Sequence, residues 1–257
     1  MLERYTDKMR ARSATLLVSL ENRLDRILQF WLLIAGFIAA ARIAFSPPPS
    51  GGAPLATFAS YTLVVVAPFA STLLALRWFK DGDRQSQPTT RLARIGKWRT
   101  LTPSQARRNP LYGTTGIMVS LMIGMMLNVP VRAAEYFTAM PPIPEVAPNW
   151  LSALHFALTL DVVLFGSLYM IAFAAALRRV PLFPRLLAAI WIGDLAMQVF
   201  TAKLVVAAGP LPPAVSAALQ SMLEGNVKKV LISVALWLPY LLLSKRVNVT
   251  FRQRVPA

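Results

Sequence analysis

Three charged side chains lie inside apolar stretches that are long enough to cross a membrane, and they are the residues with the clearest capacity for chemistry. They are Asp161, Asp194 and Lys203. A carboxylate in the hydrocarbon core costs at least about 2.5 kcal/mol, so it has to be paired, protonated or in contact with water. Carboxylates of this kind form the proton relays of pumps and transporters. The chemistry that these residues could perform is therefore binding and release of a proton.

The same charges have a structural interpretation, because they lie on two consecutive apolar stretches, residues 151–177 and 183–208. Folding these stretches as a helical hairpin places Asp161 level with Lys203. The sequence therefore predicts a salt bridge between Asp161 and Lys203. Polar pairs of this kind hold helices together inside membranes, and this is the alternative to proton transfer.

Asp194 cannot share that salt bridge. Positions 194 and 203 are nine residues apart, about 900° of helical rotation, so their side chains lie on opposite sides of the helix. We expect Asp194 to accept a hydrogen bond from Tyr169, with Gln198 and Thr201 continuing its polar side. It should also face a cavity or another helix, for which the polar end of the third expected span is one candidate.

Other catalytic or metal-binding patterns have little support. His155, near the outer end of residues 151–177, could pass protons inward, although a single histidine at an interface usually binds a water or a carbonyl. One histidine and two separated aspartates do not make a metal-ligand cluster. The chain has no cysteine and no Gly-rich phosphate loop. The sequence therefore predicts no enzyme, no metal and no cofactor.

Composition indicates the elements that position these residues. The chain is 56% hydrophobic and only 15% charged, which is typical of a multi-pass membrane protein. We expect an all-α, polytopic protein in which an N-terminal amphipathic helix, residues 1–27, runs directly into the first of six transmembrane helices. The expected spans cover about residues 28–45, 54–76, 112–131, 151–177, 183–208 and 228–243.

The distribution of charge predicts how the chain is threaded. Of the 27 Lys and Arg residues, 22 lie in residues 1–27, 77–110, 178–185 and 245–257. The positive-inside rule therefore places both termini in the cytoplasm. We expect the basic loop 77–110 to contact anionic lipids rather than nucleic acid, with Ile95 and Trp98 on one amphipathic helix.

Small residues form a ridge along the third expected span. They recur every four positions, at Gly116, Ser120, Gly124 and Asn128. Such a ridge lets another helix approach closely, and it predicts helix packing, a protein partner or a homo-oligomer. Arg132 extends the ridge, and Glu135 lies one turn further on, so the outer end could carry a polar lining in which these two residues pair.

The end of the chain carries a recognisable pattern. Residues 236–251 read Leu-Trp-Leu-Pro-Tyr-Leu-Leu-Leu-Ser-Lys-Arg-Val-Asn-Val-Thr-Phe. This segment resembles the closing signature of an uncharacterised family of bacterial inner-membrane proteins, domain of unknown function 2569. The resemblance implies that residues 228–243 are a genuine span and that the protein lies in a bacterial inner membrane. It implies no activity, it does not cover the first half of the chain, and the expected spans outnumber those usual in the family.

Two functional hypotheses follow. In the first, the protein is a non-catalytic accessory or scaffold subunit of a membrane complex, and its buried charges hold helices together. In the second, it is a small proton-coupled transporter that uses Asp194, Asp161 and Lys203. No internal repeat relates the two halves of the sequence, which is modest support for the first hypothesis.

Overall fold

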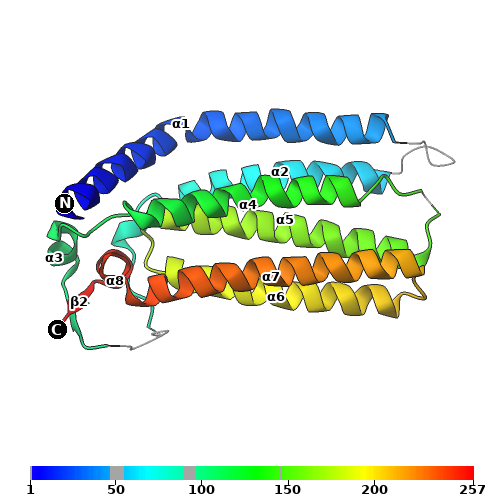
Figure 1. The fold of residues 1–257 in the computed structure, drawn as a ribbon. Helices are drawn as coiled ribbons and strands as arrows, with labels where there is room; N and C mark the ends of the chain where they lie inside the picture. Colours follow the sequence, from blue (N-terminus) through cyan, green and yellow to red (C-terminus); the bar gives the residue numbers. More distant parts are fainter. Residues whose placement is uncertain (1, 47–54, 90–95, 145) are drawn as a thin grey trace.

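The computed structural model describes residues 2–46, 55–89, 96–144 and 146–257. The fold is all-α, as predicted, and six of the described helices are long and apolar enough to cross a membrane. They are α1 (Leu2–Ala44), α2 (Leu55–Trp78), α4 (Ile117–Ala139), α5 (Asn149–Leu177), α6 (Phe183–Ala207) and α7 (Pro213–Leu243). Figure 1 shows them running side by side, with both chain ends at the same end of the bundle.

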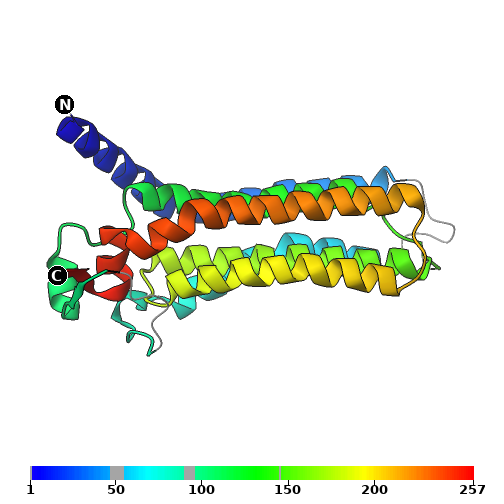
Figure 2. The ribbon, with the colours of Figure 1, turned by 60° about the horizontal axis from the view of Figure 1, so that its bottom comes forward.

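The six helices form two layers. Figure 2 shows α1, α4 and α7 in one layer and α2, α5 and α6 in the other. Helix α5 is central, because it packs against α2, α4 and α6. In its most apolar stretch 67% of the residues are buried, compared with 17% in α1 and 11% in α7. Helices α1 and α7 therefore expose much more side-chain surface than the centre of the bundle.

The predicted continuity at the N-terminus is confirmed, whereas the bounds of the third span need correction. Residues 2–27 and the first span form one continuous helix, α1. The third span begins later and ends later than residues 112–131. Gly113 and Gly116 adopt positive φ values of 109° and 76°, so the helix starts only at Ile117. It then continues through Pro130, because membrane helices tolerate proline where neighbouring groups satisfy the freed carbonyl.

The last span is longer than the sequence predicted. The expected span over residues 228–243 is the second half of α7, which begins at Pro213 and also contains Pro239. The predicted turn between the first two spans falls largely on residues 47–54, outside the described residues, and so does Ile95 in the basic loop.

A compact cap covers the end of the bundle that holds both termini. It contains the short helices η1 (Gly82–Arg84), α3 (Pro103–Arg108) and α8 (Lys245–Arg252). Strand β1 (Trp98–Thr100) pairs antiparallel with β2 (Arg254–Pro256), so the basic loop is clipped to the C-terminal tail. The prediction of an amphipathic helix at Trp98 is wrong, because Gly96 has a φ of 87° and Trp98 begins a strand that a distant segment completes.

Candidate functional site: an arginine between two carboxylates

The buried carboxylates share one guanidinium, that of Arg132 on α4. Arg132 Nη1 donates to Asp161 Oδ2 at 2.8 Å, and Nη2 donates to Asp194 Oδ2 in a second ion pair. The remaining donor, Nε, bonds to Asn128 Oδ1 at 2.9 Å, one turn earlier on the same helix. The planar fork of arginine thus joins α4, α5 and α6 at one point. We call Arg132, Asp161 and Asp194 the ion-pair centre.

Neutral side chains complete the surroundings of the two carboxylates. The Tyr169 hydroxyl donates to Asp194 Oδ2 at 3.2 Å, which confirms the predicted hydrogen bond. Gln198 Nε2 lies 3.3 Å from Asp161 Oδ1 and 3.4 Å from Asp194 Oδ1. The guanidinium carbon of Arg132 also lies 5.3 Å from the ring centroid of Phe165 and 5.8 Å from that of Tyr169, so it makes cation–π contacts with two rings of α5.

The centre lies deep inside the bundle. Asp194 is fully buried, and Asp161 is 7% exposed. At about 1.5 Å per residue, Asp194 lies roughly 16 Å from the start of α6 at Phe183, which is near the middle of a 30 Å hydrocarbon core. With both carboxylates ionised the centre would carry one negative charge, and a single bound proton would make it neutral.

The predicted salt bridge between Asp161 and Lys203 is wrong. Lys203 is exposed on α6, and no ion pair involves it among the described residues. Asp161 contacts α6 through Gln198, more than one helical turn from Lys203 towards the hairpin turn. The expected neighbour on the hairpin is replaced by Arg132 of α4. Lys203 lies one turn before the end of α6 at Ala207, where a lysine can extend to the membrane surface.

His155 does not reach the ion-pair centre. Its ring is buried, and Nε2 lies 3.4 Å from the hydroxyl of Tyr136, which in turn bonds to Thr159 Oγ1 at 2.8 Å. Across the described residues, no hydrogen bond joins His155 to Asp161 or Asp194. The predicted proton path from His155 to the carboxylates therefore lacks a direct contact in this structure.

A small polar crevice separates α4 from α7. The predicted pair of Arg132 with Glu135 does not form, because Glu135 pairs with Lys229 of α7 at the surface. Asn226 connects this surface pair to Gln198 beside the ion-pair centre. Its Oδ1 accepts from Lys229 at 3.4 Å, and its Nδ2 donates to Gln198 Oε1 at 3.3 Å. The crevice has a volume of about 50 Å³ and is lined by Arg132, Glu135, Asn226 and Lys229 among others. That volume is enough for one or two water molecules.

The small-residue ridge divides into three parts. Asn128 accepts a hydrogen bond from Arg132 of the ion-pair centre. Gly116 is not on the helix face, because it precedes α4 with a positive φ, and its N–H donates to Ser13 Oγ at 2.8 Å. Ser120 and Gly124 are exposed, and a Cβ on Gly124 would meet no atom within 4 Å. No described helix of this chain packs on that part of the ridge.

The C-terminal pattern forms part of the cap. Asn248 is fully buried, its Oδ1 accepts from Arg252 at 3.0 Å and from Arg254 at 2.7 Å, and its Nδ2 bonds to the Ser244 carbonyl at 2.9 Å. Burial, together with the nearby charges of Arg254 and Arg185, lowers the pKa of Arg252 to about 10. Thr250 Oγ1 accepts from the N–H of Gly113 at 3.0 Å, which ties the tail to the segment before α4.

Comparison with known proteins gives no match, either to a protein-family model, to a curated protein or to a solved structure. The described residues also contain no group of three or more His, Asp or Glu side chains placed to hold a metal ion. The arrangement of the site is therefore interpreted from its own chemistry. That chemistry is an ion-paired cross-link between helices, with a capacity for one proton.

Proposed function

We propose that the protein is a non-catalytic accessory or scaffold subunit of a membrane complex. The observation that carries this proposal is the closed form of the ion-pair centre, in which both carboxylates are held by Arg132. Because three helices depend on one guanidinium, the centre fixes their rotation and depth relative to one another. Inside a membrane, polar contacts of this kind hold helices together where the hydrophobic effect between helices is weak.

We place the protein in a bacterial inner membrane with both termini in the cytoplasm. The end of the bundle that holds both termini also holds α3, α8 and the β1–β2 clip (Figure 1). The segments at this end contain most of the Lys and Arg residues of the chain, which the positive-inside rule assigns to the cytoplasmic side. The described part of loop 77–110 lies at the same end, where it would meet the anionic lipids of the inner leaflet.

The face offered to a partner is the exposed part of the small-residue ridge, Ser120 and Gly124 on α4. A second helix can approach such a face closely, because no side chain extends from Gly124 and the hydroxyl of Ser120 can donate a hydrogen bond. The occupant would be a transmembrane helix of another subunit or of a second copy of this chain.

A single-cysteine experiment tests this face, and the chain is suited to it because it contains no cysteine of its own. We expect Gly124→Cys, labelled with a short thiol-reactive photo-crosslinker and irradiated in native membranes, to give one discrete adduct. The matched control is Ile192→Cys, which is 69% exposed on α6, in the opposite layer. Scaffold function through α4 would be refuted by equal labelling of the two variants, together with purification of a homogeneous monomer in mild detergent.

A proton-coupled transporter is a second candidate, favoured by one specific observation. The crevice between α4 and α7 leads from the surface pair of Glu135 and Lys229 to Arg132, and the centre can hold one proton. Lys203 is no longer part of the proposed proton path, because it forms no ion pair with Asp161. Reconstitution in liposomes containing a pH-sensitive dye tests it. Proton flux above that of Asp194→Asn would support transport, whereas equal flux in both proteins would reject it.

A further inference from the structure

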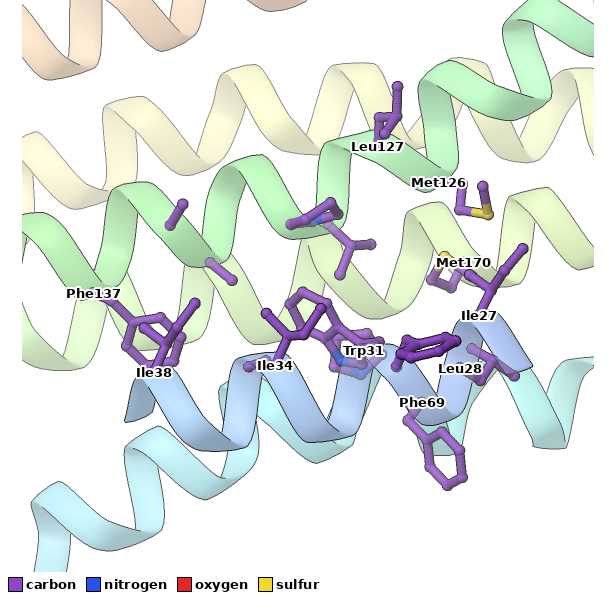
Figure 3. A pocket seen from close by; sticks show the side chains of 17 residues that line it. Ile27, Leu28, Trp31, Ile34, Ile38, Phe69, Met126, Leu127, Phe137 and Met170 are labelled. Atoms are coloured by element: carbon purple, nitrogen blue, oxygen red, sulfur yellow. The ribbon is translucent and has the colours of Figure 1, made fainter. Parts of the chain in front are cut away.

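An apolar groove lies on the other side of α4, between α4 and α1. It has a volume of about 280 Å³, and its floor is formed by Pro68 and Phe69 of α2 and Met170 of α5. Figure 3 shows side chains of α1 and α4 facing one another across it. The rim is open to the surface, since Ile34 is 58% exposed and Leu127 is 54% exposed. In a membrane, a groove of this kind opens to hydrocarbon rather than to water.

The length of the groove identifies its occupant. On α1 it extends from Ile27 to Ile38, which corresponds to about 16 Å along the helix axis. That distance is about half of a 30 Å hydrocarbon core, or the depth of one leaflet. A transmembrane helix of a partner or of a second copy would need a groove through the full thickness. An acyl chain from a single leaflet matches the length that is present.

The position of the groove identifies the leaflet. Arg23, Asp25 and Arg26 are the last charged residues before the apolar stretch of α1, and the next charge is Arg42. The groove begins at Ile27, directly after the two arginines. It therefore opens at the membrane boundary on the side of the N-terminus and ends near mid-membrane.

Arg23 lies on the same face of α1 as the groove. It is four residues before Ile27, so its side chain projects about 40° from that of Ile27. It is eleven residues before Ile34, which places the two side chains within about 20° of one another. Arg23 is exposed, and no carboxylate of the described residues forms an ion pair with it. A guanidinium in this position can bind a phosphate at the mouth of the groove.

We propose that the α1–α4 groove binds one phospholipid of the leaflet on the N-terminal side, with an acyl chain in the groove and its phosphate on Arg23. The lipid adds to the contacts that α1 already makes with α4. Direct attachment of this part of α1 includes one hydrogen bond, from Trp31 Nε1 to the Val65 carbonyl at 2.9 Å. The proposal depends on α1 crossing the membrane, and it is independent of scaffold or transport function.

Trp31 provides the readout, because it lines the groove. The full chain is reconstituted in nanodiscs that contain a phosphatidylglycerol brominated in its acyl chain, since bromine quenches indole fluorescence on contact. The chain has six Trp residues, so the contribution of Trp31 is the difference between the wild type and Trp31→Phe. We expect this contribution to be quenched at low mole fractions of the brominated lipid.

Arg23→Gln tests the phosphate contact. We expect it to raise the mole fraction needed for half-quenching by about threefold to tenfold, the range for loss of one ordinary hydrogen bond, because Arg23 is exposed and its charge is screened. Arg12→Gln is the matched control, because it removes the same charge from an exposed position on the same side of α1, three turns further from the groove. Equal values for these two variants would overturn the proposal.

Two further measurements separate a lipid site from general apolar contact. A brominated maltoside detergent has a chain but no phosphate, and quenching of Trp31 at the same mole fraction as with the phospholipid would overturn the proposal. Ala134→Phe places a ring in the groove from α4, where Ala134 is exposed on the lining. We expect it to abolish the Trp31 quenching while the protein keeps its melting temperature. Unchanged quenching in this variant would show that the lipid lies elsewhere.

Discussion

Replacing Arg132 with glutamine tests the ion-pair centre most directly. The variant keeps a polar side chain of similar length but removes the charge that Asp161 and Asp194 share. Two carboxylates then remain in the interior of the bundle without a counter-ion. Gln198 and Tyr169 can donate hydrogen bonds to them, but neither supplies a positive charge.

The size of the effect follows from this arrangement. Removing one partner of a buried ion pair costs about 3–5 kcal/mol, because the other partner is left charged and desolvated. The carboxylates can become neutral by taking up protons. Protonating a carboxylate with an ordinary pKa at pH 7 costs about 4 kcal/mol, however. Either route gives a loss of about 3–5 kcal/mol. For a chain of this size the corresponding fall in melting temperature is about 10 °C.

The assay is thermal unfolding in mild detergent, followed by Trp fluorescence and by recovery of the monomer peak in gel filtration. Asp161→Asn is the matched control, because it leaves a neutral pair of Arg132 and Asp194. We expect this control to lose about 1 kcal/mol, the value of one ordinary hydrogen bond. The loss of melting temperature in Arg132→Gln, relative to the wild type, should also become smaller between pH 8 and pH 5. Its folded state takes up protons on the carboxylates, so folding is favoured as the pH falls.

Equal melting temperatures for Arg132→Gln and Asp161→Asn would refute this reasoning. So would a deficit of Arg132→Gln that does not change with pH. Either result would mean that water reaches the carboxylates and solvates them, and the closed form of the centre would then no longer support a scaffold.

Three further predictions use the same unfolding assay. Lys203→Met should leave the melting temperature within about 2 °C of the wild type, because exposed substitutions change stability by about 0.5 kcal/mol or less. Asn248→Leu removes the oxygen that two arginines share, and we expect a loss of about 2–3 kcal/mol together with faster proteolysis of the C-terminal tail. Gly82→Ala should destabilise the cap, because its Cβ would lie 2.7 Å from the Arg178 carbonyl, whereas Gly124→Ala meets no atom within 4 Å and should be neutral in the isolated chain.

Hydropathy was sufficient to predict the number of spans and the fold class, because a helix that crosses hydrocarbon needs a long apolar stretch. The ends of the spans were harder to predict. The start of α4 depends on Gly116, whose positive φ keeps it out of the helix. Strands β1 and β2 cover three residues each, which is too short for an alternating pattern to be visible in the sequence. Their pairing depends on where the whole bundle places two distant segments.

Prediction of the ion-pair centre from the sequence was also incomplete. Tyr169 and Gln198 were predicted around Asp194, because spacing along a hairpin is enough to place them. The polar end of the third span was one of the neighbours considered for Asp194, but Arg132 was paired with Glu135 instead, since nothing local to α5 and α6 determines how α4 rotates against them. A signal was present in the sequence. Arg132 and Glu135 are the two charges near the outer end of α4, and an arginine inside a membrane span pairs with a carboxylate of its own helix or of another one.

The order in which the chain is made has a consequence for α4. Arg132 precedes Asp161 by 29 positions and Asp194 by 62. At about 5–20 residues per second, Arg132 leaves the ribosome about 1.5–6 s before its first counter-ion and about 3–12 s before its second. An unpaired arginine inside a span costs up to about 2.5–3.5 kcal/mol during insertion. The ion pairs that offset this cost can form only after α5 and α6 have been synthesised. The final packing of α4 therefore depends on helices that are made later.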